Sequence, residues 1–75
     1  MDIRKKVGLR IRELRTALEL TQESLASLAG IDKSYVNEVE NGKRNISVIN
    51  LERLITALNT NFLDFFKTES FTDHV

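Results

Sequence analysis

The sequence predicts a compact, all-α domain of five short helices. Apolar residues recur at three- and four-residue spacing along the first and fourth segments, which is typical of an amphipathic helix. Residues that favour the N-cap position stand directly before the second to fifth predicted helices: Thr21, Asp32, Ser47 and Asn61. We expect helices over residues 2–18, 22–29, 33–40, 48–58 and 62–66.

The first predicted helix carries one apolar stripe and a basic remainder. Its stripe consists of Ile3, Val7, Ile11, Leu14 and Leu18. Residues 1–15 contain six Lys or Arg against two acids, whereas residues 64–75 contain one Lys against three acids. The formal net charge is zero, so this asymmetry makes the basic end the better candidate to face phosphate. Gly8 is expected to permit the close approach of another helix.

The second and third helices are joined by a tight turn. Thr21 caps the second helix, and Gly30 follows it where a residue at positive φ ends a helix. Asp32 caps the third helix, where its charge suits the positive helix end, and Asn41-Gly42 closes it. Ala26 and Gly30 have the spacing that a helix-turn-helix needs at the helix contact and at the turn. Apolar residues occupy its remaining core positions: Leu25, Ala29, Ile31, Val36 and Val39.

These residues resemble the phage-repressor and Cro-like helix-turn-helix family, also called the XRE family. The resemblance extends from about Val7 to Phe66 and implies a λ-repressor-like DNA-binding fold. Residues 43–47, Lys-Arg-Asn-Ile-Ser, and residues 50–51, Asn-Leu, are similar to the controller proteins of restriction–modification systems.

The resemblance implies three further features. Arg15 is expected to pair with Glu40 as a structural clamp between the first and third helices. Gln22 is expected to reach the DNA backbone. The family usually has glycine where this chain has Glu19, so either Glu19 holds positive φ with strain of about 1 kcal/mol, or the loop differs locally.

The outward face of the third helix is the expected DNA-reading surface. If Glu40 points inward, then a rotation of about 100° per residue places Ser34, Glu38 and Asn41 outward, flanked by Lys33 and Asn37. Lys can donate to guanine, Asn can pair with adenine, and Ser can do either. We assign base reading to Lys33, Ser34, Asn37 and Glu38. Glu38 also repels phosphate, and it equally suits a selectivity element that rejects wrong sequences at a cost in affinity.

Residues around this face are expected to contact the DNA flanks. Tyr35 borders the core, and packing and a DNA contact are equally good interpretations of it. The loop after Gly42 should place side chains beside phosphates, which position a protein without reading sequence. The flanking set is Gln22, Tyr35, Asn41, Lys43, Arg44 and Asn45.

The C-terminal third is expected to form a homodimer interface. The fourth helix has a core stripe of Val48, Leu51, Leu54, Ile55 and Leu58, and Ile49 falls on the opposite side. Four apolar residues spread around the fifth helix, more than one core contact can bury. We predict that Ile49, Phe62 and Phe65 form the apolar centre of the interface, and that Phe66 lies inside the fold.

Composition limits the remaining possibilities. Seventy-five residues make one domain, which we place at residues 1–66 with a C-terminal arm at 67–75. Phe71 is a candidate to dock from this arm, and His74 is expected to be solvated. The chain has no cysteine, no signal-peptide pattern and no membrane span, which suits a bacterial or phage-derived cytoplasmic protein. No metal site, cofactor motif or catalytic constellation emerges, so we do not expect an enzyme.

The function expected from the sequence is therefore regulation of transcription. A homodimer would bind double-stranded DNA at a roughly palindromic operator, with one third helix in each major groove. A restriction–modification controller is favoured over a prophage repressor, a general XRE regulator or an antitoxin. A protein–protein adaptor that uses the aromatic C-terminal patch is the alternative from another class, and the zero net charge keeps it open.

Overall fold

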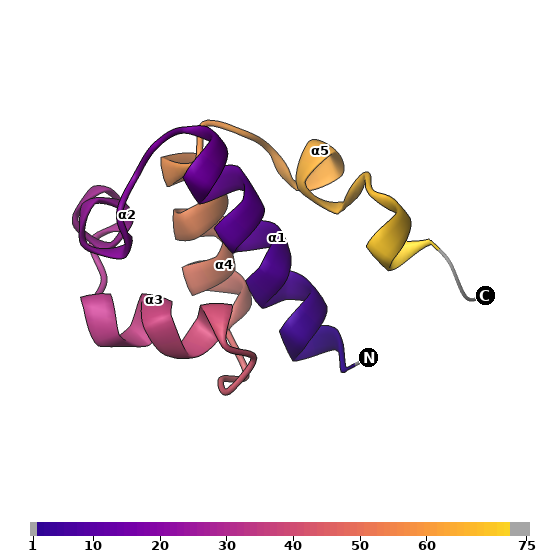
Figure 1. Ribbon diagram of the computed structural model, residues 1–75, viewed down its shortest axis with the longest axis horizontal. Coiled ribbons are helices and arrows are strands. Elements are labelled where there is room, and N and C mark those ends of the chain that lie inside the picture. The colour runs from indigo at the N-terminus through magenta and orange to yellow at the C-terminus, as the bar shows by residue number, and fades with distance from the viewer. Residues whose placement is uncertain (1, 73–75) are drawn as a thin grey trace.

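A computed structural model of the chain describes residues 2–72 and contains helices without strands over that range. The α-helices are α1 (Ile3–Ala17), α2 (Gln22–Ala29), α3 (Lys33–Glu40), α4 (Val48–Ala57) and α5 (Phe62–Phe66), followed by a 3-10 turn, η1 (Glu69–Phe71). α3 packs against α1 and α2, and α4 packs against α2 and α5. α2 and α3 lie at one end of the molecule, and α5 lies toward the other (Figure 1). This all-α arrangement confirms the predicted fold class.

Side-chain caps fix most helix starts where the sequence predicts them. Thr21, Ser47 and Asn61 each accept a hydrogen bond from the backbone N–H three residues later, and Asp2 accepts one from Arg4. Asp32 has the extended backbone of an N-cap residue, but its side chain makes no capping hydrogen bond. Its expected contribution as a cap is therefore limited to its charge at the helix start.

The loops use the left-handed backbone region at both expected and unexpected residues. Gly30 has φ of 72° and ends α2. Glu19 has φ of 59°, which decides between the two alternatives for the loop after α1: the non-glycine residue holds positive φ. Asn59 does the same after α4, with φ of 60°. At the two non-glycine residues this backbone conformation costs about 1 kcal/mol each, and asparagine tolerates it better than glutamate.

Close approach of α1 and α3 depends on Gly8. A Cβ atom at this position would collide with the backbone carbonyl oxygens of Val39 and Glu40. This confirms the role expected for Gly8 and explains how two short helices bring side chains into one core. The core consists of Val7, Ile11, Leu25, Ala26, Ala29, Val36, Val39, Leu51, Leu54, Ile55, Leu58 and Phe65.

Three residues assigned to core stripes are exposed instead. Ile3 is the first residue of α1 and Leu18 is its C-cap residue, and both are exposed, whereas Val7 and Ile11 between them are buried. Val48 is the first residue of α4 and its side chain is 75% exposed. The periodic pattern places a residue on a helix face, but it does not show how far along the helix its neighbours extend.

Phe65 is fully buried, so its assignment to the centre of a dimer interface was wrong. Its ring packs edge-on against Phe66, 4.9 Å between centroids, and Phe71 packs edge-on against Phe66 at 4.8 Å. Phe66 lies at the partly buried rim of this cluster and not deeper than Phe65. Phe71 belongs to the expected arm and docks on the same cluster. His74 lies outside the described residues.

Arg10 determines how α5 is fixed against α1. Its Nε donates to the Phe65 carbonyl oxygen at 2.7 Å, and its Nη2 donates to the Asp64 carbonyl oxygen at 2.9 Å. Both carbonyls belong to the last turn of a five-residue helix, where the Asp64 carbonyl oxygen also accepts from the backbone N–H of the C-cap residue, Lys67. The guanidinium therefore anchors the helix in the orientation that turns Phe65 inward.

Candidate nucleic-acid interface

α3 has one buried side and one polar side. Val36, Val39 and Glu40 are buried, whereas Lys33, Ser34 and Asn37 are exposed. Tyr35 and Glu38 are intermediate, and Asn41 is exposed at the C-cap. The rotation assumed from the sequence, with Glu40 inward, is therefore the rotation that the fold adopts. The polar side carries the donors and acceptors that a helix in the major groove needs.

The Arg15–Glu40 ion pair connects α1 with α3. Arg15 Nε lies 2.6 Å from Glu40 Oε2, and Arg15 Nη2 lies 2.9 Å from Glu40 Oε1. The Arg15 Nη1 atom also donates to the Leu20 carbonyl oxygen. The Arg15 side chain is 12% exposed and that of Glu40 3% exposed. Hydrogen bonding to Glu40 raises the pKa of the Arg15 guanidinium above its usual value. The expected clamp is present, bidentate and almost entirely shielded from solvent.

A chain of side-chain amides runs from this clamp onto the exposed side of α3. Gln22 Nε2 donates to Glu40 Oε1 at 3.0 Å. Asn37 Nδ2 donates to Gln22 Oε1 at 3.2 Å, and Asn41 Nδ2 donates to Asn37 Oδ1 at 3.3 Å. Gln22 was expected at the DNA backbone, and here its amide lies between the buried carboxylate and a predicted base reader. We call these three residues, Gln22, Asn37 and Asn41, the amide chain.

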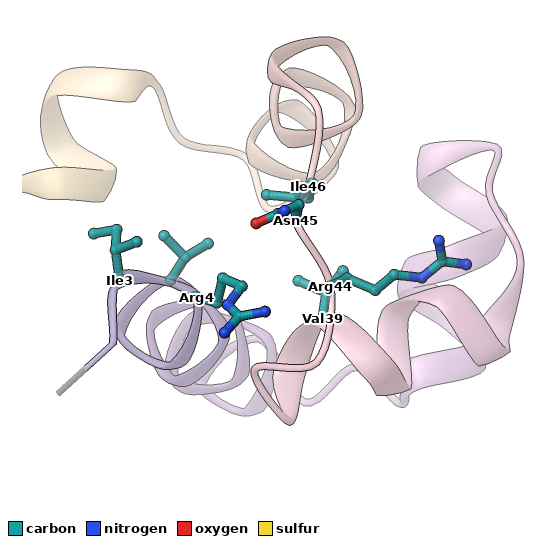
Figure 2. Close-up of a pocket in the computed structure, with 7 residues that line it drawn as sticks. Ile3, Arg4, Val39, Arg44, Asn45 and Ile46 are labelled. Atoms are coloured by element: carbon teal, nitrogen blue, oxygen red, sulfur yellow. The ribbon is translucent and has the colours of Figure 1, made fainter.

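Arg44 lies across the outer side of α3 and does not extend freely from its loop. Its Nε donates to Glu38 Oε1 at 2.8 Å, and its guanidinium carbon lies 4.7 Å from the centre of the Tyr35 ring. Figure 2 shows the Arg44 side chain extending away from Ile3 and Ile46, along α3. The pair unites Glu38, expected to read bases, and Arg44, expected at phosphate. Tyr35 lies beneath them as a packed ring.

The loop from Arg44 to Ile46 borders a small cavity. The cavity has a volume of about 160 Å³, and its lining, seen in Figure 2, comes from the start of α1, the end of α3 and this loop. The residues that line it are Ile3, Arg4, Val7, Val39, Arg44, Asn45 and Ile46. The side chains of Lys43, Arg44 and Asn45 in this loop are exposed.

Three arginines of α1 already have partners within the protein. Arg15 is committed to Glu40, and Arg10 to α5 and Glu13. Arg4 forms an ion pair with Asp2, and hydrogen bonds from Arg4 lower the pKa of the Asp2 carboxyl from 3.8 to about 2. Asp2 and Glu13 are already counted among the acids of residues 1–15, so of these pairs it is Arg15–Glu40 that lowers the excess of cations this end offers to phosphate.

Besides the Arg44–Glu38 contact, two features of the site were missed in the sequence. The amide chain carries a weak signal, because Asn37 and Asn41 have the spacing of neighbours on one helix face, but its link to Gln22 depends on how α2 and α3 pack. Leu63 is 76% exposed on α5, next to the partly exposed Phe62, and was not assigned to the interface.

The described residues contain no cluster of three or more His, Cys, Asp or Glu that suits a metal ion. No helix in the described range is long and apolar enough to span a membrane.

Comparison with known proteins identifies related molecules along most of the chain. The helix-turn-helix family HTH_3 matches residues 11–65. C.AhdI, a restriction-modification controller protein from Aeromonas hydrophila, is 51% identical, with a TM-score of 0.81 covering 84% of this chain and 96% of that one. Control protein C.MunI from Mycoplasma sp is 36% identical over 66 residues, 87% of this chain and 89% of that protein. The controller protein C.Esp1396I, solved as a tetramer with its natural 35 base-pair operator, is 28% identical with a TM-score of 0.84, covering 89% of this chain and 88% of that one.

Proposed function

The chain belongs to the HTH_3 family of helix-turn-helix proteins, and from this premise we propose that it is a sequence-specific DNA-binding transcriptional regulator of the restriction–modification controller type. Two relatives, C.AhdI and C.MunI, are themselves control proteins of this class. A third, C.Esp1396I, binds an operator as an oligomer. The proposal carries the same mode of action to this chain: binding of duplex DNA by more than one subunit.

The observation that carries the proposal is the polar outer side of α3. Lys33, Ser34 and Asn37 lie exposed in the N-terminal part of α3, the part of a recognition helix that reaches base edges in the major groove. The buried clamp fixes the helix on the opposite side, so the polar side has a defined orientation relative to α1 and α2. A helix held this way presents a rigid set of donors and acceptors to the groove.

Side chains around α3 are placed to contact the phosphates. Lys43, Arg44 and Asn45 follow the C-terminal end of α3, and their exposed side chains can flank the groove that the helix enters. Arg44 must exchange Glu38 for a phosphate oxygen, and both side chains are about half exposed, so this exchange costs little. Glu38 then weakens non-specific binding. Its carboxylate repels a nearby phosphate unless Arg44 leaves Glu38 and binds that phosphate.

A homodimer supplies the second recognition helix that an operator needs. Two-fold pairing places the half-sites about one helical turn apart, about 34–36 Å. The exposed apolar residues of α4 and α5 are the candidates for the shared surface: Ile49, Phe62 and Leu63. Leu63 replaces Phe65 in this set, because Phe65 is committed to the core. Patches of this kind on a small domain often mark an interface.

The test is binding to the DNA upstream of the protein's own gene, because controllers and autoregulators both act there. Electrophoretic mobility shift should show tighter binding to this fragment than to a coding-sequence fragment of equal length, by a factor of roughly 10³ or more. Footprinting should show a protected sequence with approximate two-fold symmetry. Equal affinity for both fragments and for a randomised library would contradict the proposal and favour the protein–protein adaptor. The location of an endonuclease or methyltransferase gene beside this one would separate a controller from other regulators.

A further inference from the structure

We propose that Gln22 is a positioning residue that fixes the amide orientation of Asn37, and that the buried Glu40 carboxylate dictates this orientation through Gln22. The proposal rests on the proposed function, since it concerns how α3 distinguishes bases. It assigns Gln22 a role in specificity that is separate from any contact with the DNA backbone.

The first step is the orientation of Gln22. A carboxylate accepts hydrogen bonds and donates none, and Glu40 is buried with both of its oxygens accepting from Arg15. The amide group of Gln22 must therefore turn its Nε2 toward Glu40, and the distance from Nε2 to Oε1 is 3.0 Å. A flipped amide would place its carbonyl oxygen against a shielded negative charge, which burial makes costly.

The second step passes this orientation to α3. Because Nε2 of Gln22 is bonded to Glu40, Gln22 presents its Oε1 to Asn37. Asn37 must therefore donate from its Nδ2, and the distance between these two atoms is 3.2 Å. The Asn37 Oδ1 atom then faces Asn41 and accepts from its Nδ2 at 3.3 Å. Each amide in the chain has one orientation consistent with all its neighbours. A flip of Asn37 alone would oppose two oxygen atoms on the Gln22 side and two NH₂ groups on the Asn41 side.

The third step connects orientation with base reading. An asparagine pairs with adenine in the major groove through one donor and one acceptor, and a flip of the amide exchanges their positions. In the amide chain, Asn37 retains one Nδ2 hydrogen and one Oδ1 lone pair for DNA. A free asparagine would adapt to a base pair with the reversed pattern, whereas an oriented one rejects it. Gln22 therefore restricts what Asn37 accepts, which is a contribution to specificity.

A phosphate contact is the competing role for Gln22. Such a contact would support binding to all sequences alike, because it carries no base information. Two substitutions separate the roles. Gln22→Met removes both the donor and the acceptor of the side-chain amide and leaves Glu40 paired with Arg15. Gln22→Lys retains a donor for Glu40 and adds a charge that favours phosphate, but it cannot accept a hydrogen bond from Asn37.

The experiment uses the full chain and a duplex that the wild type selects from a randomised library. Affinities are measured for this duplex, for its single base-pair variants and for a random duplex of equal length. Asn37→Ala should weaken binding to the selected duplex by roughly 5- to 150-fold, the range expected for a base-reading side chain. It should also remove the preference at one base pair of each half-site. Thermal melting checks that every variant is folded.

The proposal expects Gln22→Met to relax the preference at that same base pair, with a loss of roughly 2- to 13-fold on the selected duplex and little change on the random one. In the Asn37→Ala background, Gln22→Met should cause no further change in the preference at this base pair. Gln22→Lys should strengthen random binding and still relax this position. Equal losses on both duplexes for Gln22→Met, additive with Asn37→Ala, would overturn the proposal in favour of a phosphate contact. A wild type that selects no sequence would instead contradict the proposed function itself.

Discussion

Arg44 Nε lies 2.8 Å from Glu38 Oε1 on the outer side of α3. A cation that suits phosphate is thus paired with a carboxylate that repels phosphate. The Arg44 guanidinium also lies over the Tyr35 ring. Neither side chain of the ion pair is buried, and an exposed pair of this kind is worth about 0–1 kcal/mol. The contact therefore holds Arg44 near the groove-facing helix, but it is weak enough for Arg44 to leave Glu38 and bind a phosphate.

Arg44→Ala should weaken binding to selected and random DNA alike. Each lost phosphate contact reduces the number of counterions released, so the slope of log affinity against log salt should become shallower by about one unit per contact removed from each subunit. The control is Lys67→Ala, an exposed lysine that directly follows α5, at the other end of the molecule from α3 (Figure 1). An unchanged slope for Arg44→Ala would remove this residue from the phosphate contacts.

Loss of either partner of the Arg15–Glu40 pair should destabilise the fold. Arg15→Met and Glu40→Met each leave an uncompensated charge in a shielded site, which costs about 3–5 kcal/mol. Denaturant unfolding of both single variants and the double variant measures the coupling, and the double variant should lose much less than the sum. The exposed pair formed by Arg44 and Glu38 serves as a comparison and should couple by less than about 1 kcal/mol. Additive losses at Arg15 and Glu40 would show that the two charges do not interact.

Ile49→Asp should give a folded monomer. Ile49 is 66% exposed on α4, so the fold should tolerate the charge, whereas an apolar dimer interface should not. Leu28→Asp is a matched control, because Leu28 is 63% exposed on α2, outside the proposed interface. Sedimentation should show a dimer for the wild type and for Leu28→Asp at tens of micromolar. A dimeric Ile49→Asp variant, or a monomeric wild type, would exclude this interface.

Phe65→Asp should unfold the domain and not merely separate subunits. The ring is fully buried against Phe66 and Phe71, so the substitution removes core packing and buries a charge. Loss of a buried phenylalanine side chain alone costs about 3–5 kcal/mol, a large part of the stability of a small domain. Circular dichroism should show loss of helix, whereas Phe62→Asp, at the more exposed start of α5, should remain helical. A folded Phe65→Asp variant would contradict the core assignment.

The Asp2 carboxyl should titrate at about pH 2, below its usual value of 3.8, because it accepts hydrogen bonds from the Arg4 side chain and backbone. Its folded-state pKa is lower than its unfolded value, so its contribution to stability is present above pH 3.8 and is lost as the pH falls through about 2. NMR titration of the Asp2 carboxyl carbon measures the midpoint. Arg4→Ala should raise the midpoint toward 3.8, and a wild-type midpoint already there would contradict the pairing.

Much of the candidate site follows from sequence because a helix is a local structure. Thr21, Gly30 and the apolar spacing between them predict α2 and the turn, and the inward position of Glu40 then fixes which residues of α3 face outward. The same logic fails for Val48, because a residue on the core side of a helix is buried only if another element extends over it. It also fails for Glu38 and Arg44, whose contact depends on the path of a loop.

By itself, the sequence determined the helices and the helix-turn-helix, because short-range spacing and capping control these features. The side of α3 that faces solvent followed from the family resemblance, which implies that Glu40 points inward toward Arg15. Only the tertiary structure decided that Phe65 is core and Phe62 is more exposed. Five residues cannot define their own rotation, and α5 is held by tertiary contacts that include hydrogen bonds from Arg10 of α1 to the Asp64 and Phe65 carbonyl oxygens. The tertiary structure also decided that Gln22 joins Glu40 to Asn37, because this chain of hydrogen bonds exists only once α1, α2 and α3 have packed together.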